Sequence, residues 1–200
     1  MNTFVRCLSL SVTLVTLMIS ATGSAQEGAR LQTDLSGFRE VVGPDLGIGA
    51  IFSTGNGQLT LKINNQTRQI TYELTYAFPD AAATPIIGTQ FVNQAHLHFG
   101  QKHTTGAINV WLCQSADSPA PGAVAAITPT CPSPSGTVTG TITPGKVLAL
   151  APSGFPGGDA GFDALLDAIK NDAIYGNVHT DRSPAGEIRG QVGDLPIQAQ

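Results

Sequence analysis

The amino-acid sequence predicts an all-β protein, an antiparallel Greek-key β-sandwich or barrel with one short helix in a connection. Three observations support this fold class. Charged residues make up only 12% of the 200 residues, and 23 Gly and 13 Pro supply many turns. Several segments alternate polar and apolar residues with the period of a strand. Only one segment follows the period of a helix.

Two neighbouring segments show the strand period most clearly. In 58–64, QLTLKIN, the residues Leu59, Leu61 and Ile63 share one face. The segment 69–77, QITYELTYA, alternates in the same way after a short connection that contains Asn. Two such runs joined by a short turn predict an antiparallel hairpin.

Further strands are expected at 29–37, 95–99, 107–112, 136–142, 174–180 and 186–192. The segment 107–112, AINVWL, alternates so that Ile108, Val110 and Leu112 are expected to share a face. Several short antiparallel strands of this kind are typical of a sandwich or a Greek-key barrel.

One helix is predicted near 162–171. Apolar residues recur there at i, i+3, i+4 and i+7, namely Phe162, Leu165, Leu166 and Ile169. Asp159 precedes them and is placed to cap the start of the helix.

Residues 1–25 are predicted to be a secretory signal peptide. Arg6 is their only charge, an apolar run follows, and small residues suit cleavage after Ala25. The run is too short to span a bilayer, and no later segment is apolar enough to do so. We therefore expect an exported chain without a membrane span after cleavage, secreted or located in the periplasm or outside the cell.

The mature chain, 26–200, has the size of a single domain, with its core in about 29–192. Without Arg6 it holds 9 basic and 14 acidic residues, and the basic residues are scattered along the chain. Nothing in this pattern attracts a phosphate backbone, so no nucleic acid partner is expected.

Two cysteines remain after cleavage, Cys113 and Cys131. In an oxidising compartment an even pair predicts a disulfide. The alternative, two metal-binding thiolates, lacks the close spacing of a zinc motif. We therefore expect one bridge, which closes a loop rich in Pro, Ala and Ser.

Three of the four histidines fall within 95–106, AHLHFGQKHTTG, and the fourth is His179. Residues two apart in a strand share a face, so His96 and His98 are expected to project together, opposite their apolar neighbours. His103 belongs to the polar loop after this strand and is expected to be solvated.

The last two strands carry polar residues at the same parity. Asn177 and His179 alternate with apolar residues, and so do Glu187 and Arg189. If the apolar members face the core, a cluster of histidine, carboxylate and guanidinium groups gathers on the outer face of the sheet. Glu187 and Arg189 are expected to pair within this cluster rather than to act as acid or base.

Two interpretations of this cluster compete. The His-x-His pair, with His179 as a third ligand, offers imidazoles for a copper or zinc ion. Alternatively, the polar groups satisfy one another in a hydrogen-bonded network that fixes the strand register. Because a His-x-His pair alone is a weak signal for a metal site, we favour the hydrogen-bonded network.

No motif for nucleophilic catalysis is present. The sequence contains no G-x-S-x-G, and no phosphate-cradling glycine loop precedes the helix. We therefore expect no catalytic residues and no enzymatic activity, with metal-dependent redox activity as the alternative.

Three blocks of the sequence resemble the CHRD (chordin) domain family. They are LSGFREV near the start, AHLHFG…GAINVWL in the middle and IYGNVHTDRSPAGEIRGQV near the end, and the likeness covers about 29–192. The resemblance implies an extracytoplasmic β-sandwich without an established enzymatic activity. The leading hypothesis is therefore a non-catalytic binding or structural module without a cofactor. Its partner is expected to be an extracytoplasmic protein, glycan or surface ligand.

A shorter likeness links HLHFG to the His-x-His-x-Phe-Gly strand of copper/zinc superoxide dismutase, a Greek-key barrel with metal on its outer face. Too few histidines remain for both a copper and a zinc site. The alternative function is therefore a protein that binds one copper or zinc ion through His96, His98 and His179, without assumed catalysis.

Overall fold

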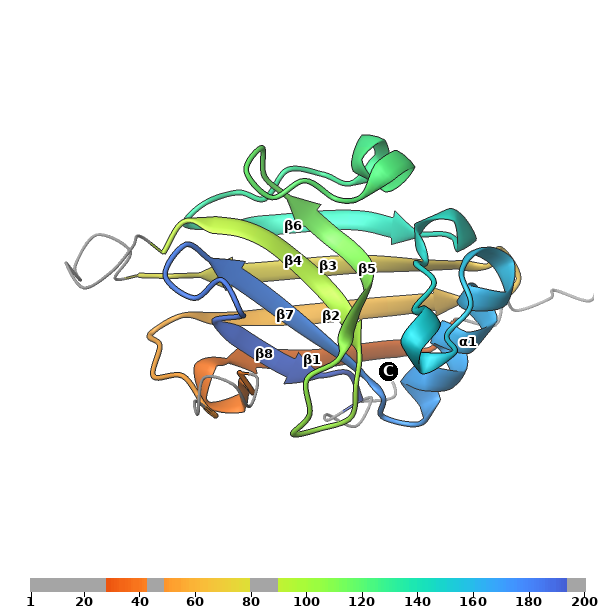
Figure 1. Ribbon diagram of the computed structural model, residues 1–200, viewed down its shortest axis with the longest axis horizontal. Helices are drawn as coiled ribbons and strands as arrows, with labels where there is room; N and C mark the ends of the chain where they lie inside the picture. Colours follow the sequence, from red (N-terminus) through yellow and green to blue (C-terminus); the bar gives the residue numbers. More distant parts are fainter. Residues whose placement is uncertain (1–27, 43–48, 80–89, 194–200) are drawn as a thin grey trace, which may run out of the picture.

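The computed structural model describes residues 28–42, 49–79 and 90–193, and the predicted signal peptide lies outside them. Eight antiparallel strands form one sheet in the order β5-β4-β7-β8-β1-β2-β3-β6 (Figure 1). Their bounds are β1 Arg30–Ser36, β2 Asn56–Asn64, β3 Gln69–Ala77, β4 Val92–Phe99, β5 Ala107–Gln114, β6 Ser135–Ile142, β7 Ile174–Thr180 and β8 Ile188–Gln191. The sheet curls into a nearly closed barrel, which confirms the predicted antiparallel all-β class.

Alternate residues of the long strands fill the interior of the barrel. Leu59 and Leu61 of β2 are each 1% exposed, and Ile70 and Leu74 of the neighbouring strand β3 are 0% and 1% exposed. The polar residues between them face outward, because successive side chains of a strand point to opposite faces. Burial of one aliphatic side chain contributes about 1.5–3 kcal/mol. This alternation therefore determines which face of the hairpin turns inward.

The helix α1, Gly158–Lys170, confirms the predicted helical segment. Its apolar face buries Phe162 and Leu165 completely, and the helix packs at one end of the barrel (Figure 1). The expected cap at Asp159 is wrong, because Gly157 occupies the N-cap position and Asp159 lies inside the first turn. A carboxylate in the first turn still interacts favourably with the helix dipole.

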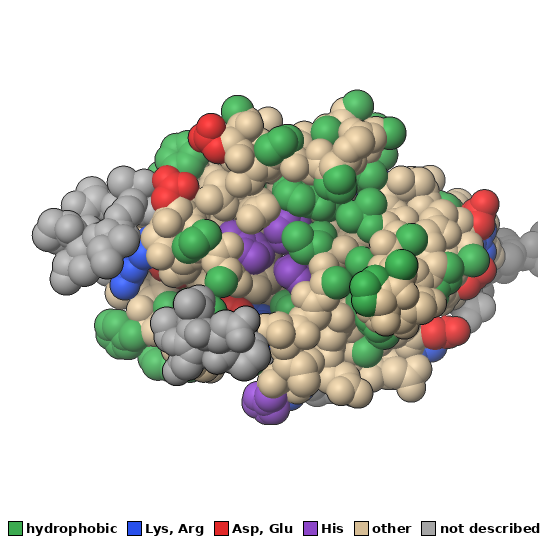
Figure 2. All heavy atoms as spheres, in the orientation of Figure 1, with side chains coloured by type: hydrophobic (Ala, Val, Ile, Leu, Met, Phe, Trp, Pro, Cys, Tyr) green, Lys and Arg blue, Asp and Glu red, His purple; other side chains and the backbone are tan. Residues whose placement is uncertain are grey.

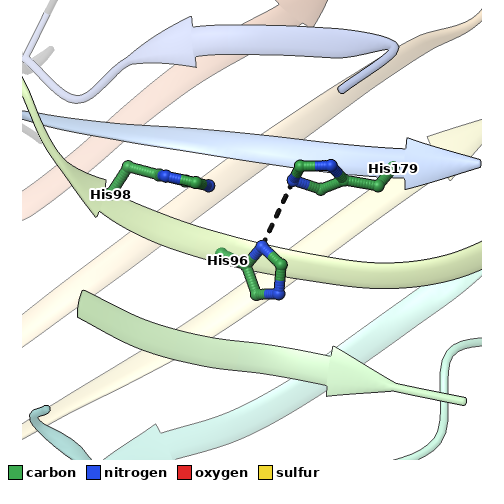
Figure 3. A group of neighbouring side chains, drawn as sticks. All are labelled: His96, His98 and His179. Atoms are coloured by element: carbon green, nitrogen blue, oxygen red, sulfur yellow. Dashed lines mark hydrogen bonds between the residues drawn. The ribbon is translucent and has the colours of Figure 1, made fainter. Parts of the chain in front are cut away.

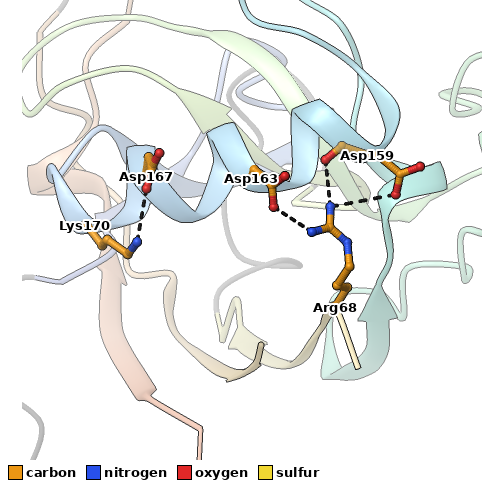
Figure 4. Close-up of polar contacts among 5 residues, drawn as sticks. All are labelled: Arg68, Asp159, Asp163, Asp167 and Lys170. Carbon is orange, nitrogen blue, oxygen red and sulfur yellow. Dashed lines mark hydrogen bonds and ion pairs between the residues drawn. The ribbon is translucent and has the colours of Figure 1, made fainter. Parts of the chain in front are cut away.

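Ion pairs on the outer side of α1 join it to the β2–β3 turn. Arg68 of that turn reaches Asp163 at 2.8 Å and Asp159 at 3.8 Å, while Lys170 pairs with Asp167 within the helix (Figure 4). All these groups are exposed, and such pairs contribute little to stability. The apolar face of the helix is therefore what holds it on the barrel.

The register between β4 and β5 corrects one expectation. His96 lies opposite Trp111 and His98 lies opposite Ile108, so two steps along β4 match three steps along β5. This bulge turns Ile108 to the outer face, where it packs against Trp111, whereas Val110 stays in the barrel core. The prediction that Ile108 and Val110 share a face is wrong, because an extra residue in a strand reverses its parity.

Contacts across the barrel cover the seam between the two edge strands, β5 and β6. The disulfide predicted between Cys113 and Cys131 is present, and it joins β5 to the segment that leads into β6. The hydroxyl of Tyr72 on β3 donates to the carbonyl of Leu112 on β5 at 2.7 Å. The stretch after β6 also bonds to the backbone of β5. These contacts occupy backbone groups that an open edge would expose.

We expect reduction of the Cys113–Cys131 bridge to lower the free energy of unfolding by about 3 kcal/mol. The two residues are 18 positions apart, and breaking the bond restores the freedom of that loop in the unfolded chain. Urea titrations with and without reductant measure the change. The double variant C113S/C131S is the control, because its unfolding does not respond to reductant. Equal stability of the oxidised and reduced protein contradicts the prediction.

Candidate functional site

Three histidines from two neighbouring strands meet on the outer face of the sheet. β4 carries His96 and His98, and β7 carries His179, with His96 opposite Asn177 and Gln94 opposite His179 in the antiparallel register. Figure 3 shows the three rings pointing toward one another. Each ring offers one nitrogen, and these three atoms lie within 4.8 Å of one another. The structure thus brings together the three histidines that the sequence singles out as ligands.

The cluster is buried but can be reached from outside. His96, His98 and His179 are 0%, 7% and 5% exposed. Figure 2 shows histidine side chains at the floor of a hollow near the centre of this face. His103 lies apart from the cluster, in the loop after β4, and its side chain is exposed as expected.

Backbone carbonyls determine the tautomer of two of the rings. Nδ1–H of His98 donates to the carbonyl of Gly106 at 2.9 Å, and Nδ1–H of His179 donates to the carbonyl of Pro184 at 3.0 Å. Because a carbonyl can only accept, each of these rings carries its lone pair on Nε2 when it is neutral. Two lone pairs therefore face the interior of the cluster.

His96 completes the cluster through one ring-to-ring hydrogen bond. Its Nδ1 lies 3.2 Å from Nε2 of His179, which can only accept in the neutral tautomer, so His96 donates (Figure 3). Nε2 of His98 is buried and has no hydrogen-bond partner among the described residues. One acceptor nitrogen with a free lone pair is thus aimed into the cluster.

Burial keeps all three rings neutral over a wide pH range. Desolvation lowers the pKa of His98 to about 3 and the pKa of His179 to about 4, although the carbonyls of Gly106 and Pro184 act in the opposite direction. Burial also lowers the pKa of His96 well below its ordinary value, and the two neighbouring rings lower it further. Neutral imidazole is the form that binds a metal ion.

Aromatic rings enclose the cluster on two sides. The ring of Tyr175 stacks on His98 with a centroid distance of 4.7 Å and an interplanar angle of 5°. The guanidinium of Arg189 lies 3.4 Å from the centroid of the Tyr175 ring, a cation–π contact. On the other side, Trp111 meets His96 edge to face at 4.2 Å. These contacts limit the rotation of both histidines of β4.

The loop between β4 and β5 is tied to the cluster through its backbone. Both polar groups of the Gly106 peptide are used, since its N–H donates to the Tyr175 hydroxyl and its carbonyl accepts from His98. Arg189 donates to the carbonyls of Thr104 and Gln101 in the same loop. A Cβ at position 106 would lie 2.1 Å from the carbonyl oxygen of Phe99, so this close approach requires glycine.

The other predicted polar residues lie on the same strands but form separate groups. Glu187 is fully buried and accepts hydrogen bonds from Ser53, Gln90 and Thr180. The expected pair of Glu187 with Arg189 is not found among the described residues.

Asn177 belongs to a second small group. Its side-chain amide donates to Oε1 of Glu40 at 3.3 Å. Burial raises the pKa of Glu40, against the opposing effects of a backbone hydrogen bond from Val41 and of the charge of Arg189. Asn177, Glu187 and Arg189 are thus neighbours of the histidines, and no described hydrogen bond joins them to the cluster.

Sequence reasoning missed two residues in direct contact with the histidines. Tyr175 has the parity of Asn177 and His179, so the two-residue period of β7 was sufficient to place it on the same face. Trp111 has the opposite parity to Val110 and Leu112, so the period of β5 also placed it on the outer face, but its position directly across from His96 depends on the bulge in β5.

The fold and the site together define an all-β domain with a buried histidine cluster on the outer face of its sheet. The family model of the CHRD domain matches residues 31–192. The chain therefore belongs to the CHRD domain family, in agreement with the three sequence blocks that resemble it. No curated protein and no solved structure gives a significant match to the chain.

Family membership supports a binding or structural module in general terms. CHRD domains occur in extracellular or secreted proteins, and the family is not known for enzymatic activity. Within the described residues, no helix is long and apolar enough to cross a membrane.

We expect the metal-free protein to lose stability as the pH falls from about 7 toward 4. The unfolded histidines titrate near 6.5, whereas the folded pKa is about 3 for His98 and about 4 for His179. Between these values the unfolded chain binds more protons, so the free energy of unfolding decreases. Each histidine contributes a loss of about 1.4 kcal/mol per pH unit in this window, and none above it.

Urea titrations at pH 7, 6 and 5 measure this slope. The variant His98→Gln should have a shallower slope, because it lacks one of the titrating groups, and the comparison cancels the contribution of every other group. The variant His103→Gln is the matched control, because it removes an exposed histidine that lies apart from the cluster. Identical slopes for wild type and His98→Gln contradict the prediction.

Proposed function

We propose that this chain is an extracytoplasmic, non-catalytic binding module and that His96, His98 and His179 hold one transition metal ion. The observation that carries the proposal is the convergence of three neutral imidazole nitrogens within 4.8 Å. Two of these rings have their tautomer set by a backbone carbonyl, which puts the lone pair on Nε2. Histidines that bind metal ions commonly use such a carbonyl to orient the ring.

The spacing of the rings suits a metal ion after a small adjustment. A zinc or copper ion lies about 2.1 Å from an imidazole nitrogen, which separates ligand nitrogens by about 3.6 Å in a trigonal site. Nδ1 of His96 and Nε2 of His179 are 3.2 Å apart, and no separation among the three ligand atoms exceeds 4.8 Å. Nδ1 of His96 becomes a ligand once its proton moves to Nε2, which has no hydrogen-bond partner among the described residues. Side-chain rotations that move the ring nitrogens by about 1 Å therefore suffice to bring them to ligand distance of one ion. The donor set suits both copper and zinc.

The environment of the cluster supports holding an ion rather than turning over a substrate. The three rings contact aromatic side chains and backbone carbonyls, those of Trp111, Tyr175, Gly106 and Pro184. Among the described residues, the buried carboxylate of Glu187 bonds to other groups. Membership of a family not known for enzymatic activity supports the same role.

A second candidate function rests on the hydrogen bond between His96 and His179. In this alternative, the cluster is a buried polar network that holds β4 against β7, and the partner of the domain binds elsewhere. Such a network contributes to stability without any ligand, because a buried polar group without a partner costs about 1–3 kcal/mol.

We expect the wild-type chain, purified without an affinity tag, to bind one metal ion per chain and to melt at a higher temperature when copper or zinc is added. At a metal concentration about 100 times the dissociation constant, the stabilisation is about 2.7 kcal/mol. Trp111 is the only tryptophan of the chain and contacts His96, so its fluorescence reports binding at this site. Elemental analysis gives the stoichiometry.

The variant His98→Ala should lose both the metal and the rise in melting temperature, whereas His103→Ala should keep them. The opposite result identifies the network: no metal in the wild type, no response to added metal, and a loss of about 1–3 kcal/mol for His98→Ala. That result would overturn the proposed metal site and leave the binding module without an assigned ligand.

A further inference from the structure

We propose that the three-histidine site selects a monovalent cation, the cuprous ion, over divalent zinc and divalent copper. This inference rests on the proposed metal site and names its ligand. Three features of the structure carry it: the charge of the donor set, the charge of its neighbours and the number of ligand positions.

The donor set contributes no negative charge. The group that can hold an ion consists of His96, His98 and His179, without a cysteine or carboxylate among the described residues. A bound divalent ion would therefore keep its full charge of two at a site where every ligand is at least nine-tenths buried. The desolvation cost of an ion grows with the square of its charge, so a divalent ion pays about four times the cost of a monovalent one.

A buried cation next to the site adds to this preference. Arg189 is 2% exposed, and its guanidinium stacks on Tyr175, which in turn stacks on His98. Its hydrogen bonds go to two neutral carbonyls, those of Gln101 and Thr104. The repulsion between this charge and a bound ion is proportional to the charge of the ion, and it is therefore twice as large for zinc as for the cuprous ion.

Two further basic residues lie near Arg189. A cavity of about 100 Å³ beside it is lined by Arg39 and Lys102, and Glu40 is its acidic member. The carboxyl of Glu40 attracts Arg189 without forming an ion pair with it among the described residues, and it is no member of the group that can hold an ion. Glu40 therefore offsets part of the guanidinium charge, and Arg189 still lowers the pKa of His98.

The ligand positions disfavour divalent copper for a separate reason. Cupric ions prefer a square-planar or tetragonal arrangement, with four ligands around the ion. The three histidines come from one face of two adjacent strands, and each is held by ring or carbonyl contacts. A filled d shell imposes no such geometry, so the cuprous ion accepts three nitrogens from one side. Zinc also accepts this geometry, and the charge of the site is what makes zinc bind more weakly than the cuprous ion.

Metal competition on the untagged wild-type chain tests the selectivity. The cuprous affinity is measured without oxygen against bicinchoninate, and the zinc affinity is measured against a zinc-binding dye. We expect the cuprous ion to bind at least a thousandfold more tightly than zinc. We also expect the copper-loaded protein to stay silent in electron paramagnetic resonance in air, because the cuprous form is the favoured one.

Variants separate the contribution of charge. Arg189→Gln should reduce the preference for the cuprous ion over zinc by about tenfold, since it removes one nearby positive charge. Lys62→Gln is the matched control, because it removes an equal charge from the exposed side of β2 and should leave the ratio unchanged. If Arg189→Gln loosens the loop and lowers the melting temperature of the metal-free protein, Arg39→Gln provides the second measurement. It should shift the ratio in the same direction by a smaller factor.

Two results distinguish the failures. If zinc or the cupric ion binds as tightly as the cuprous ion, this inference is wrong but the proposed metal site stands. The same holds if the ratio of cuprous to zinc affinity is unchanged in both arginine variants. A wild-type chain that binds none of the three ions overturns the proposed metal site itself.

Discussion

The pairing of β4 with β7 is the contact on which both the barrel and the histidine site depend. In the order of the sheet, β5 and β4 are joined to the other six strands through this ladder. The same ladder sets His96 beside His179. On its inner face, Leu97 and Val178 are completely buried. A slip of one residue would turn the histidines into the apolar core and these residues to the outside, so the core determines the geometry of the site.

Two backbone carbonyls both hold loops in place and set the tautomers of the histidines at this site. The carbonyls of Gly106 and Pro184 tie two loops to the sheet, and the same hydrogen bonds leave Nε2 of His98 and His179 as acceptors. The rings are thus arranged before any ligand arrives, and this reduces the cost of ordering them on binding. The bond between His96 and His179 holds the metal-free arrangement. The network and the metal site are therefore two uses of one geometry.

Charge is distributed unevenly around this face. The buried acidic groups of the described residues, Glu187 and Glu40, accept hydrogen bonds from their own neighbours. Arg189 is held against Tyr175 by loop carbonyls and faces the histidines through that ring. A cluster of neutral ligands beside a buried cation favours a ligand of low positive charge.

The sequence by itself determined the strands, the helix and the parity of the histidines. Alternation in β2 and β3 placed Leu59 and Ile70 inside, and the same period put His96, His98 and His179 on one face, because a strand has a strict two-residue repeat. Only the tertiary structure decided the rest. A bulge in β5 brought Trp111 against His96 and moved Ile108 outward, and no local pattern encodes an extra residue in a ladder. Glu187 and Arg189 bond to different groups, and these partners come from segments far away in the sequence. The carbonyl partners of His98 and His179 lie in nearby loops, whose conformation no periodic pattern encodes.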